Sequence, residues 1–169
     1  MARWRFGRQE FVPPVVAVDG GWRLTLDVDE RALIIRLMDE LRALLEGPDD
    51  NALLDRLFPT AYPDDEEKEA EYQRLMREEL VASRVAAIES VSELLAPEDP
   101  SLMEAVWDEG QTIAFMQSIN AIRLVLGSLL GIDDDAADDA DDAAPPEYQL
   151  YDFLSWLLEW TVRALSPDQ

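Results

Sequence analysis

The stretch QTIAFMQSINAIRLVLGSLL, residues 111–130, decides the fold of this chain. Its large apolar residues recur at alternating spacings of four and three, which is the period of a buried helical seam. These residues are Phe115, Ile119, Ile122, Leu126 and Leu129. A second strip of the same helix, offset by roughly 40–100°, consists of Met116, Asn120, Arg123 and Gly127. The pattern predicts a core helix that carries polar residues beside its apolar seam.

The second strip supplies three candidate site residues, Asn120, Arg123 and Gly127. A buried guanidinium without a partner costs on the order of several kcal/mol, so a carboxylate or several carbonyls must meet Arg123. As a structural residue, Arg123 would clamp the longest predicted helix or the segment 58–62 to the core. As a functional residue, it would form a recessed site for an anion or a peptide terminus. Gly127 would let another backbone approach closely.

Helical patterns continue on both sides of this stretch, bounded by capping and stop signals. The predicted helices cover about residues 27–46, 50–57, 64–96, 101–110 and 147–165. In the helix 64–96 we expect a buried stripe from Tyr72 through Leu75 to Leu95. The helix 147–165 is apolar on most sides, which is typical of a helix central in a core.

The N-terminal 26 residues predict a small β element instead. Residues 3–8 and 22–26 alternate between apolar and polar side chains, and Asp19-Gly20-Gly21 is a strong turn signal. The expected fold is mainly α, a single-domain bundle of about five or six helices with a small N-terminal β-hairpin-like element. Its parts are the β element 1–26, the helical core 27–132, a disordered, aspartate-rich loop 133–146 and the C-terminal core helix 147–165.

The composition restricts the chemistry more than any motif does. The 169 residues contain no histidine and no cysteine, and 37 Asp+Glu against 14 Lys+Arg give a formal net charge of −23. Thiol and imidazole catalysis are excluded, as is nearly every zinc, haem or iron–sulfur site. Paired carboxylates would catalyse only inside a cleft, and here they lie in solvated runs. We therefore expect no enzyme, no catalytic residue, no metal and no cofactor.

The acidity also indicates what the protein binds. It disfavours direct binding to nucleic acid and to anionic membranes, since both require cationic side chains. No apolar run approaches the roughly 20 residues of a membrane span, and no signal peptide follows the basic start, so we expect a cytoplasmic location. The partner that this charge attracts is a basic protein surface. A homodimer stays open.

One segment combines aromatic side chains with a constrained backbone. Residues 58–62, Phe-Pro-Thr-Ala-Tyr, contain one proline and are followed by Pro63, so the segment should be extended. Phe58 and Tyr62 either pack against the core or form part of a docking surface. Packing is the more common fate of aromatic side chains.

Short motifs in a fixed order span nearly the whole chain. They are Arg56–Tyr62 (RLFPTAY), Ile119–Gly127 (INAIRLVLG) with Leu130-Gly131-Ile132, the aspartate-rich break, and Tyr151–Leu157 (YDFLSWL). Together they resemble a small actinobacterial family of domains of unknown function, often encoded beside the adaptor of the Clp protease and relabelled as AosR-like oxidative-stress regulators. The resemblance implies a cytoplasmic regulator that contacts a sigma factor or another RNA polymerase component. Redox sensing through a thiol pair cannot be carried over, because the chain has no cysteine.

We therefore expect a non-enzymatic regulatory protein that acts by protein–protein interaction in stress-response transcription. One alternative is an accessory protein linked to Clp-dependent proteolysis, which rests on the gene neighbourhood of the resembling family. Another is an acidic mimic of nucleic acid, which would need carboxylates in a regular stripe at phosphate-like spacing. A regulator instead needs an exposed apolar patch beside the acidic groups.

Overall fold

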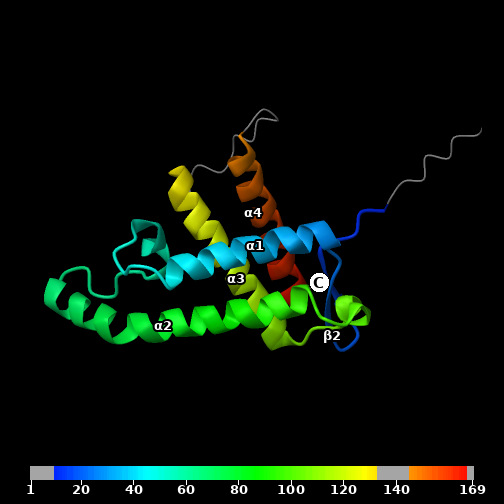
Figure 1. Cartoon of the computed structure of the whole chain (residues 1–169), viewed down its shortest axis with the longest axis horizontal. Coiled ribbons are helices and arrows are strands. Elements are labelled where there is room, and N and C mark those ends of the chain that lie inside the picture. Colours follow the sequence, from blue (N-terminus) through cyan, green and yellow to red (C-terminus); the bar gives the residue numbers. More distant parts are fainter. Residues whose placement is uncertain (1–9, 133–144, 167–169) are drawn as a thin grey trace, which may run out of the picture.

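The computed structural model describes residues 10–132 and 145–166. In that part of the chain, two strands precede four α-helices, and two short 3-10 helices lie between the α-helices (Figure 1). In chain order the elements are β1 (Val15–Val18), β2 (Gly21–Leu24), α1 (Val28–Leu45), η1 (Ala52–Leu57), α2 (Glu66–Leu95), η2 (Pro100–Glu104), α3 (Glu109–Leu130) and α4 (Pro146–Leu165). The predicted fold class, mainly helical with a small N-terminal β element, is confirmed.

The β element is a hairpin, but its first strand is not the predicted one. β1 and β2 pair antiparallel, with Val15 opposite Leu24 and Val18 opposite Gly21, around the predicted turn. The sequence predicted strands over 3–8 and 22–26, and residues 3–8 lie outside the described part of the chain. A two-residue turn pairs the residues that directly flank it, so the Val-Val-Ala-Val run becomes the partner of β2.

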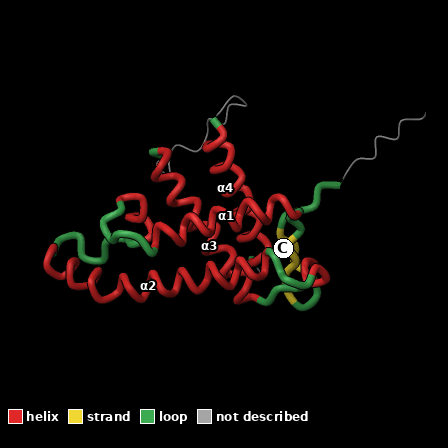
Figure 2. The backbone as a smooth tube through the Cα atoms, viewed as in Figure 1, coloured by secondary structure: helices red, strands yellow, loops and turns green. Residues whose placement is uncertain are grey.

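Backbone hydrogen bonds join the hairpin to the helical body. The amide of Trp22 donates to the carbonyl of Trp107 at 3.0 Å, and the amide of Trp107 donates back at 2.7 Å. The Trp22 indole Nε1 donates to the carbonyl of Ala164 near the end of α4 at 2.7 Å. A Cβ atom on Gly21 would lie 2.1 Å from the Trp107 carbonyl oxygen, so only glycine permits this approach. Figure 2 shows the strands beside the C-terminal end of α4.

The helix α3 lies at the centre of the fold, in contact with α1, α2, α4 and η1. Phe115, Ile119 and Ile122 are buried, as the seam predicted. The prediction is wrong for the last two residues of the seam, because Leu126 is only half-buried and Leu129 is 61% exposed. The last turn of α3 extends past α1, so its side chains lack a neighbouring helix on that side (Figure 1).

By length and composition alone, α3 is also the one helix of the described residues that would be able to cross a membrane. This similarity was not predicted, because Asn120 and Arg123 interrupt the apolar run of the helix. Since α1, α2, α4, η1 and β2 all contact α3, its apolar composition is that of a core helix.

The buried stripe predicted for α2 is correct only at the C-terminal end. Within α2 the buried residues are Ile88, Val91 and Leu95. Leu75, predicted to be buried, is 59% exposed, and Tyr72 is half-buried. A helix of 30 residues is about 45 Å long. Its N-terminal half extends past the helices that cover the other half (Figure 1).

The predicted helix 101–110 is wrong. The 3-10 helix η2 covers Pro100–Glu104, and an extended stretch leads through Trp107 to the start of α3. There the Asp108 carboxylate accepts from the amide of Gln111 at 2.8 Å, and the Gln111 side chain accepts from the amide of Asp108 at 3.0 Å. This capping box fixes a new helix start and prevents a continuous helix through Gly110.

The last helix, α4, begins and ends within a residue of its predicted bounds and packs along α3. It buries Tyr151, Leu154, Leu157 and Thr161, whereas Val162 is 45% exposed. The acidic loop predicted for residues 133–146 lies almost entirely outside the described residues.

Candidate functional site: a cleft beside an acidic helix end

Arg123 clamps α3 to α4, which is not the partner that the sequence predicted. Its Nε donates to the Ser155 hydroxyl at 2.9 Å, and its guanidinium carbon lies 5.2 Å from the centre of the Tyr151 ring. The expectation of a carboxylate or several carbonyls is therefore wrong, and so is a clamp on α2 or on the segment 58–62. A hydroxyl and an aromatic face suffice because Arg123 is only half-buried and keeps part of its hydration.

Gly127 permits close packing, as predicted, although the neighbours are side chains. A Cβ atom there would lie 3.2 Å from Cε2 of Tyr151 and 3.4 Å from Nη1 of Arg56. The second strip of α3 therefore faces α4, with Gly127 and Arg123 one turn apart against the same partner helix. Asn120 is half-buried on this strip.

The segment 58–62 contains one core residue and one surface residue. Phe58 is buried, and the guanidinium carbon of Arg77 lies 4.3 Å from the centre of its ring. Tyr62 is 45% exposed, and its ring contacts the ring of Tyr72 edge-on at 5.9 Å. Phe58 therefore packs in the core, whereas Tyr62 is exposed, and a docking role for Tyr62 stays a prediction.

Glu69 on α2 holds this segment in place. Its Oε2 accepts from the amides of Ala61 at 3.0 Å and Tyr62 at 2.7 Å, and its Oε1 accepts from Nε2 of Gln73 at 2.8 Å. Hydrogen bonds from Gln73, Tyr62 and Ala61 favour the charged form and lower the pKa of the Glu69 carboxyl from its ordinary value. This contact could not be predicted from the sequence, because Glu69 is one of many carboxylates near the start of the predicted helix 64–96.

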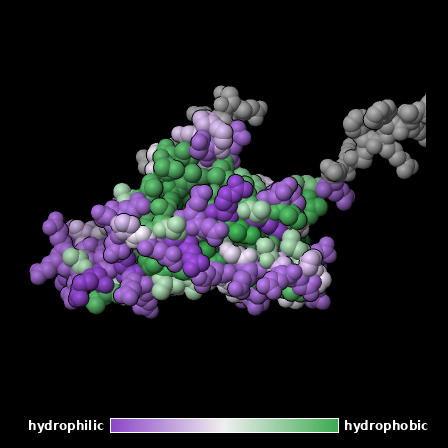
Figure 3. Space-filling view, viewed as in Figure 1, coloured by the Kyte–Doolittle hydropathy of each residue, from purple (hydrophilic) through white to green (hydrophobic). Residues whose placement is uncertain are grey.

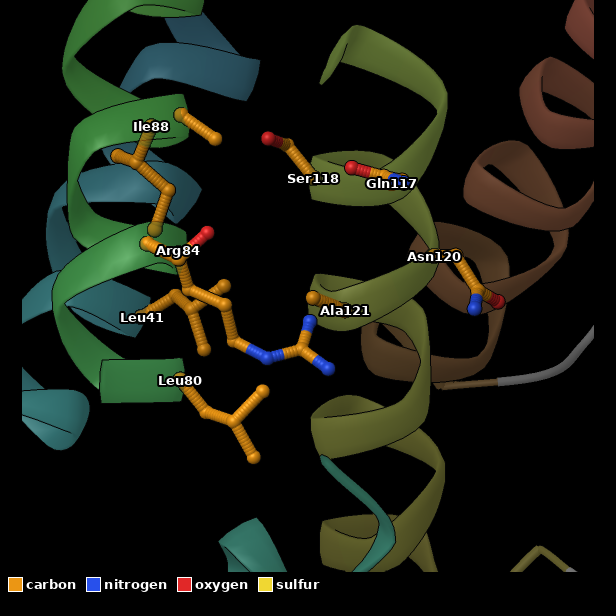
Figure 4. Close-up of a pocket in the computed structure, with 10 residues that line it drawn as sticks. Leu41, Leu80, Arg84, Ile88, Gln117, Ser118, Asn120 and Ala121 are labelled. Carbon is orange, nitrogen blue, oxygen red and sulfur yellow. The ribbon is translucent and has the colours of Figure 1, made fainter. Parts of the chain in front are cut away.

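A cleft of about 300 Å³ separates the middle of α2 from the middle of α3 (Figure 4). Small side chains leave this space: Ser83 and Ala87 on α2 and Ser118 and Ala121 on α3. The apolar residues Leu41, Leu80 and Ile88 also line it, together with Arg84, Gln117 and Asn120. Of the predicted site residues, only Asn120 lines the cleft. It does so at the edge, since Figure 4 shows its amide on the opposite side of α3 from Arg84.

Arg84 is the one charged residue that lines this cleft. Its Nη2 donates to the carbonyl of Leu57 at 3.2 Å. Among the described residues, no carboxylate forms an ion pair with it within 4.0 Å. Burial removes part of the hydration of the guanidinium and lowers the pKa of Arg84 from its ordinary value. Arg84 was not predicted as a site residue, because its position in the sequence does not show which side of α2 faces α3.

An acidic surface covers the N-terminal end of α2 and the turn before it. Residues 64–79 contain eight carboxylates and three cations. Tyr62 and Leu75 are exposed beside these groups. Figure 3 shows mainly hydrophilic residues at this projecting end of the molecule. We call the surface formed by Tyr62 and residues 64–79 the acidic end.

A second exposed apolar surface lies on α4. Phe11 is 62% exposed, and its ring contacts the rings of Trp156 and Trp160 at 6.5 Å and 5.3 Å. The guanidinium carbon of Arg163 lies 5.1 Å from the centre of the Trp160 ring. This aromatic surface is distinct from the acidic end, because it lies on α4, whereas the acidic end lies on the first turns of α2 and the turn before it.

Arg31 is the buried charge that the sequence analysis did not identify. Its guanidinium donates four hydrogen bonds of 3.0–3.2 Å to backbone carbonyls of separate segments. The acceptors are Leu24, Leu26, Leu95 and Met103. Burial lowers the pKa of Arg31 from its ordinary value, and the carbonyls compensate for the lost water. Arg31 is therefore a structural hub rather than a surface charge.

Potential metal ligands do not converge in the part of the chain that the structure describes. Groups of three or more Asp or Glu residues placed to hold a metal ion are absent from it. The cleft between α2 and α3 has a cation and hydroxyl and amide groups on its walls instead of carboxylates. Such walls suit the binding of an anionic group.

Comparison with known proteins identifies the family and no nearer relative. Searches of curated proteins and of solved structures gave no match. The model of a family described as a domain of unknown function, DUF2017, matches residues 6–165. This match covers the hairpin, the cleft, the acidic end and all four α-helices. The chain therefore belongs to the DUF2017 family.

Proposed function

We propose that this protein is a non-enzymatic regulator that binds a basic protein surface through its acidic end. The observation that carries the proposal is the combination of dense negative charge with exposed Tyr62 and Leu75 at one end of α2. Charge attracts and orients a cationic partner over several ångströms, whereas buried apolar contacts provide affinity at short range. A nucleic-acid mimic needs the charge but not the apolar side chains.

The weak packing of the N-terminal end of α2 also favours the acidic end as the binding surface. Its fully buried residues all lie from Ile88 onward, and the first of its residues that packs against the core is Leu80, so the turns before Leu80 receive little apolar support. Like charges four residues apart, such as Glu67 and Glu71, destabilise a helix by about 0.2–0.5 kcal/mol per pair. A basic partner would replace this repulsion with attraction and would cover Leu75.

For the partner we propose a stress-response sigma factor or another component of RNA polymerase, in the cytoplasm. The support is the resemblance of residues 56–62, 119–127 and 151–157 to AosR-like regulators. A basic helix or loop of such a protein has the charge that the acidic end requires. A polymerase component is preferred over the Clp adaptor because the latter rests on gene neighbourhood alone.

The test compares two triple variants with the same change in net charge. Glu67, Glu71 and Glu78 are replaced by Gln in the first, and the exposed Glu40, Glu93 and Glu98 in the control. Binding to a purified stress sigma factor is measured by biolayer interferometry at 50 mM and 300 mM salt. We expect the first variant to bind at least about tenfold more weakly at low salt and the control to bind nearly normally.

Two results would contradict the proposal. Equal weakening by both triple variants would show a response to net charge rather than to the acidic end. Failure of the unaltered protein to bind the sigma factor or the polymerase at either salt concentration would exclude the proposed partner.

A further inference from the structure

We propose that the cleft between α2 and α3 binds a small apolar carboxylate, with the Arg84 guanidinium as its counter-ion. This site is separate from the acidic end and does not depend on the proposed function. The cleft lies against the middle of α2, whereas the acidic end covers the first turns of that helix.

The shape of the cleft follows from the residues that face each other across it. Ser83 and Ala87 lie one turn apart on α2, and Ser118 and Ala121 lie one turn apart on α3. Because these four side chains are small, they leave a space between the two helices over about one turn. The resulting volume of about 300 Å³ is at the lower end of the range for small-molecule sites.

The charge of the site follows from Arg84. A guanidinium has five N–H donors, and the structure shows one hydrogen bond from Arg84, to the Leu57 carbonyl. Figure 4 shows the side chain extending from α2 across the cleft toward Ala121. Among the described arginines, Arg42, Arg77 and Arg163 form ion pairs with carboxylates, whereas Arg84 is half-buried beside the cleft and has no carboxylate within 4.0 Å. Reduced hydration strengthens its attraction for an anion.

The remaining walls define the rest of the ligand. Leu41, Leu80 and Ile88 offer an apolar surface beside the guanidinium. The Ser118 hydroxyl points toward Ile88 in Figure 4 and provides a further polar contact. The chemistry that fits is a carboxylate on a short apolar body. A free aliphatic acid and a peptide that ends in leucine both present this group.

The experiment measures ligand binding to the full chain by two-dimensional NMR of backbone amides. The probes are hexanoate and its neutral counterpart hexanamide, and the peptide Ala-Ala-Leu with a free or an amidated C-terminus. We expect hexanoate, the free-acid peptide or both to shift the backbone amide signals of residues 117–121 and 83–88. Hexanamide and the amidated peptide should bind at least about tenfold more weakly than the corresponding acids. Binding by only one acid identifies the source of the carboxylate.

Two variants and one control assign the site. Arg84→Met removes the charge and should weaken binding of the acid at least about tenfold. Ala87→Leu fills the cleft and should block binding while Arg84 remains. Arg36→Met removes an exposed arginine from α1 and should leave binding unchanged. Circular dichroism checks the fold of each variant. If Arg84→Met does not fold, the loss or survival of binding in Ala87→Leu still tests whether the ligand occupies the cleft.

The proposal fails if neither acid shifts these amides at millimolar concentration. It also fails if hexanoate and hexanamide bind equally well, since the guanidinium would then make no contribution. Binding that survives Ala87→Leu would place the ligand elsewhere on the protein.

Discussion

The two ends of α2 belong to one helix but have opposite environments. At the C-terminal end, Val91 and Leu95 are buried, and the Leu95 carbonyl accepts a hydrogen bond from Arg31 at 3.2 Å. At the N-terminal end, Leu75 is exposed among carboxylates, and the contacts of Glu69 with Ala61 and Tyr62 tie down only the preceding segment. One end of the helix therefore stabilises the fold, and the other presents a surface.

Because of this difference, substitutions at the two ends of α2 should affect different properties of the protein. Side chains at the C-terminal end contribute through burial and through hydrogen bonds to the other segments. Those at the N-terminal end contribute mainly to surface charge. Mutations at the two ends should therefore separate loss of stability from loss of binding, and three predictions test this separation.

The largest effect is expected for Arg31→Ala. The substitution leaves four carbonyls around a buried space without their donor, including that of Leu95 at the end of α2. We expect a loss of about 3–5 kcal/mol in the free energy of unfolding, measured by urea denaturation at neutral pH. The control Arg36→Ala, on an exposed side of α1, should change it by less than about 0.5 kcal/mol. A loss for Arg31→Ala as small as that of the control would show that water replaces the guanidinium.

A smaller effect is expected when the same change is made at both ends of α2. Leu95→Ala removes a side chain that is 1% exposed and should cost about 2–5 kcal/mol. Leu75→Ala removes one that is 59% exposed and should cost less than about 0.5 kcal/mol. Leu75→Ala should instead weaken binding of the basic partner. Similar losses of stability at the two positions would mean that a further contact covers Leu75 in solution, and the contrast between the ends would not hold.

Local sequence signals predicted most of the helices. Asp27 before α1 forms a capping box with Glu30, and Gly47-Pro48 follows the end of that helix. Prolines 145 and 146 mark the start of α4. Such signals act within one turn and can be read without knowledge of the fold.

The sites were harder to predict because they depend on contacts between distant residues. The carbonyls that bind Arg31 belong to residues up to 72 positions away in the sequence. Periodicity located the polar strip of α3, but only the packing of α4 shows that Arg123 meets Ser155. Likewise, the small residues of the cleft lie on two helices whose facing sides are set by the fold. The buried stripe predicted for α2 was wrong in its N-terminal half for the same reason. Periodicity does not show where a long helix extends beyond the helices that cover it.

The smallest effect concerns Glu69, which fixes residues 58–62 to the exposed half of α2. Because its pKa is lowered in the folded state, its stabilising contribution is present above the unfolded-state pKa and is lost as the pH falls below about 4.5. The amide proton shifts of Ala61 and Tyr62 should follow this titration in NMR spectra, with a midpoint below 4.5. At neutral pH, Glu69→Ala should speed hydrogen exchange at both amides, whereas Glu71→Ala, an exposed neighbour, should not. Unchanged exchange in Glu69→Ala would show that Phe58 in the core is sufficient to hold the segment, and the acidic end would then owe its shape to the body of the fold.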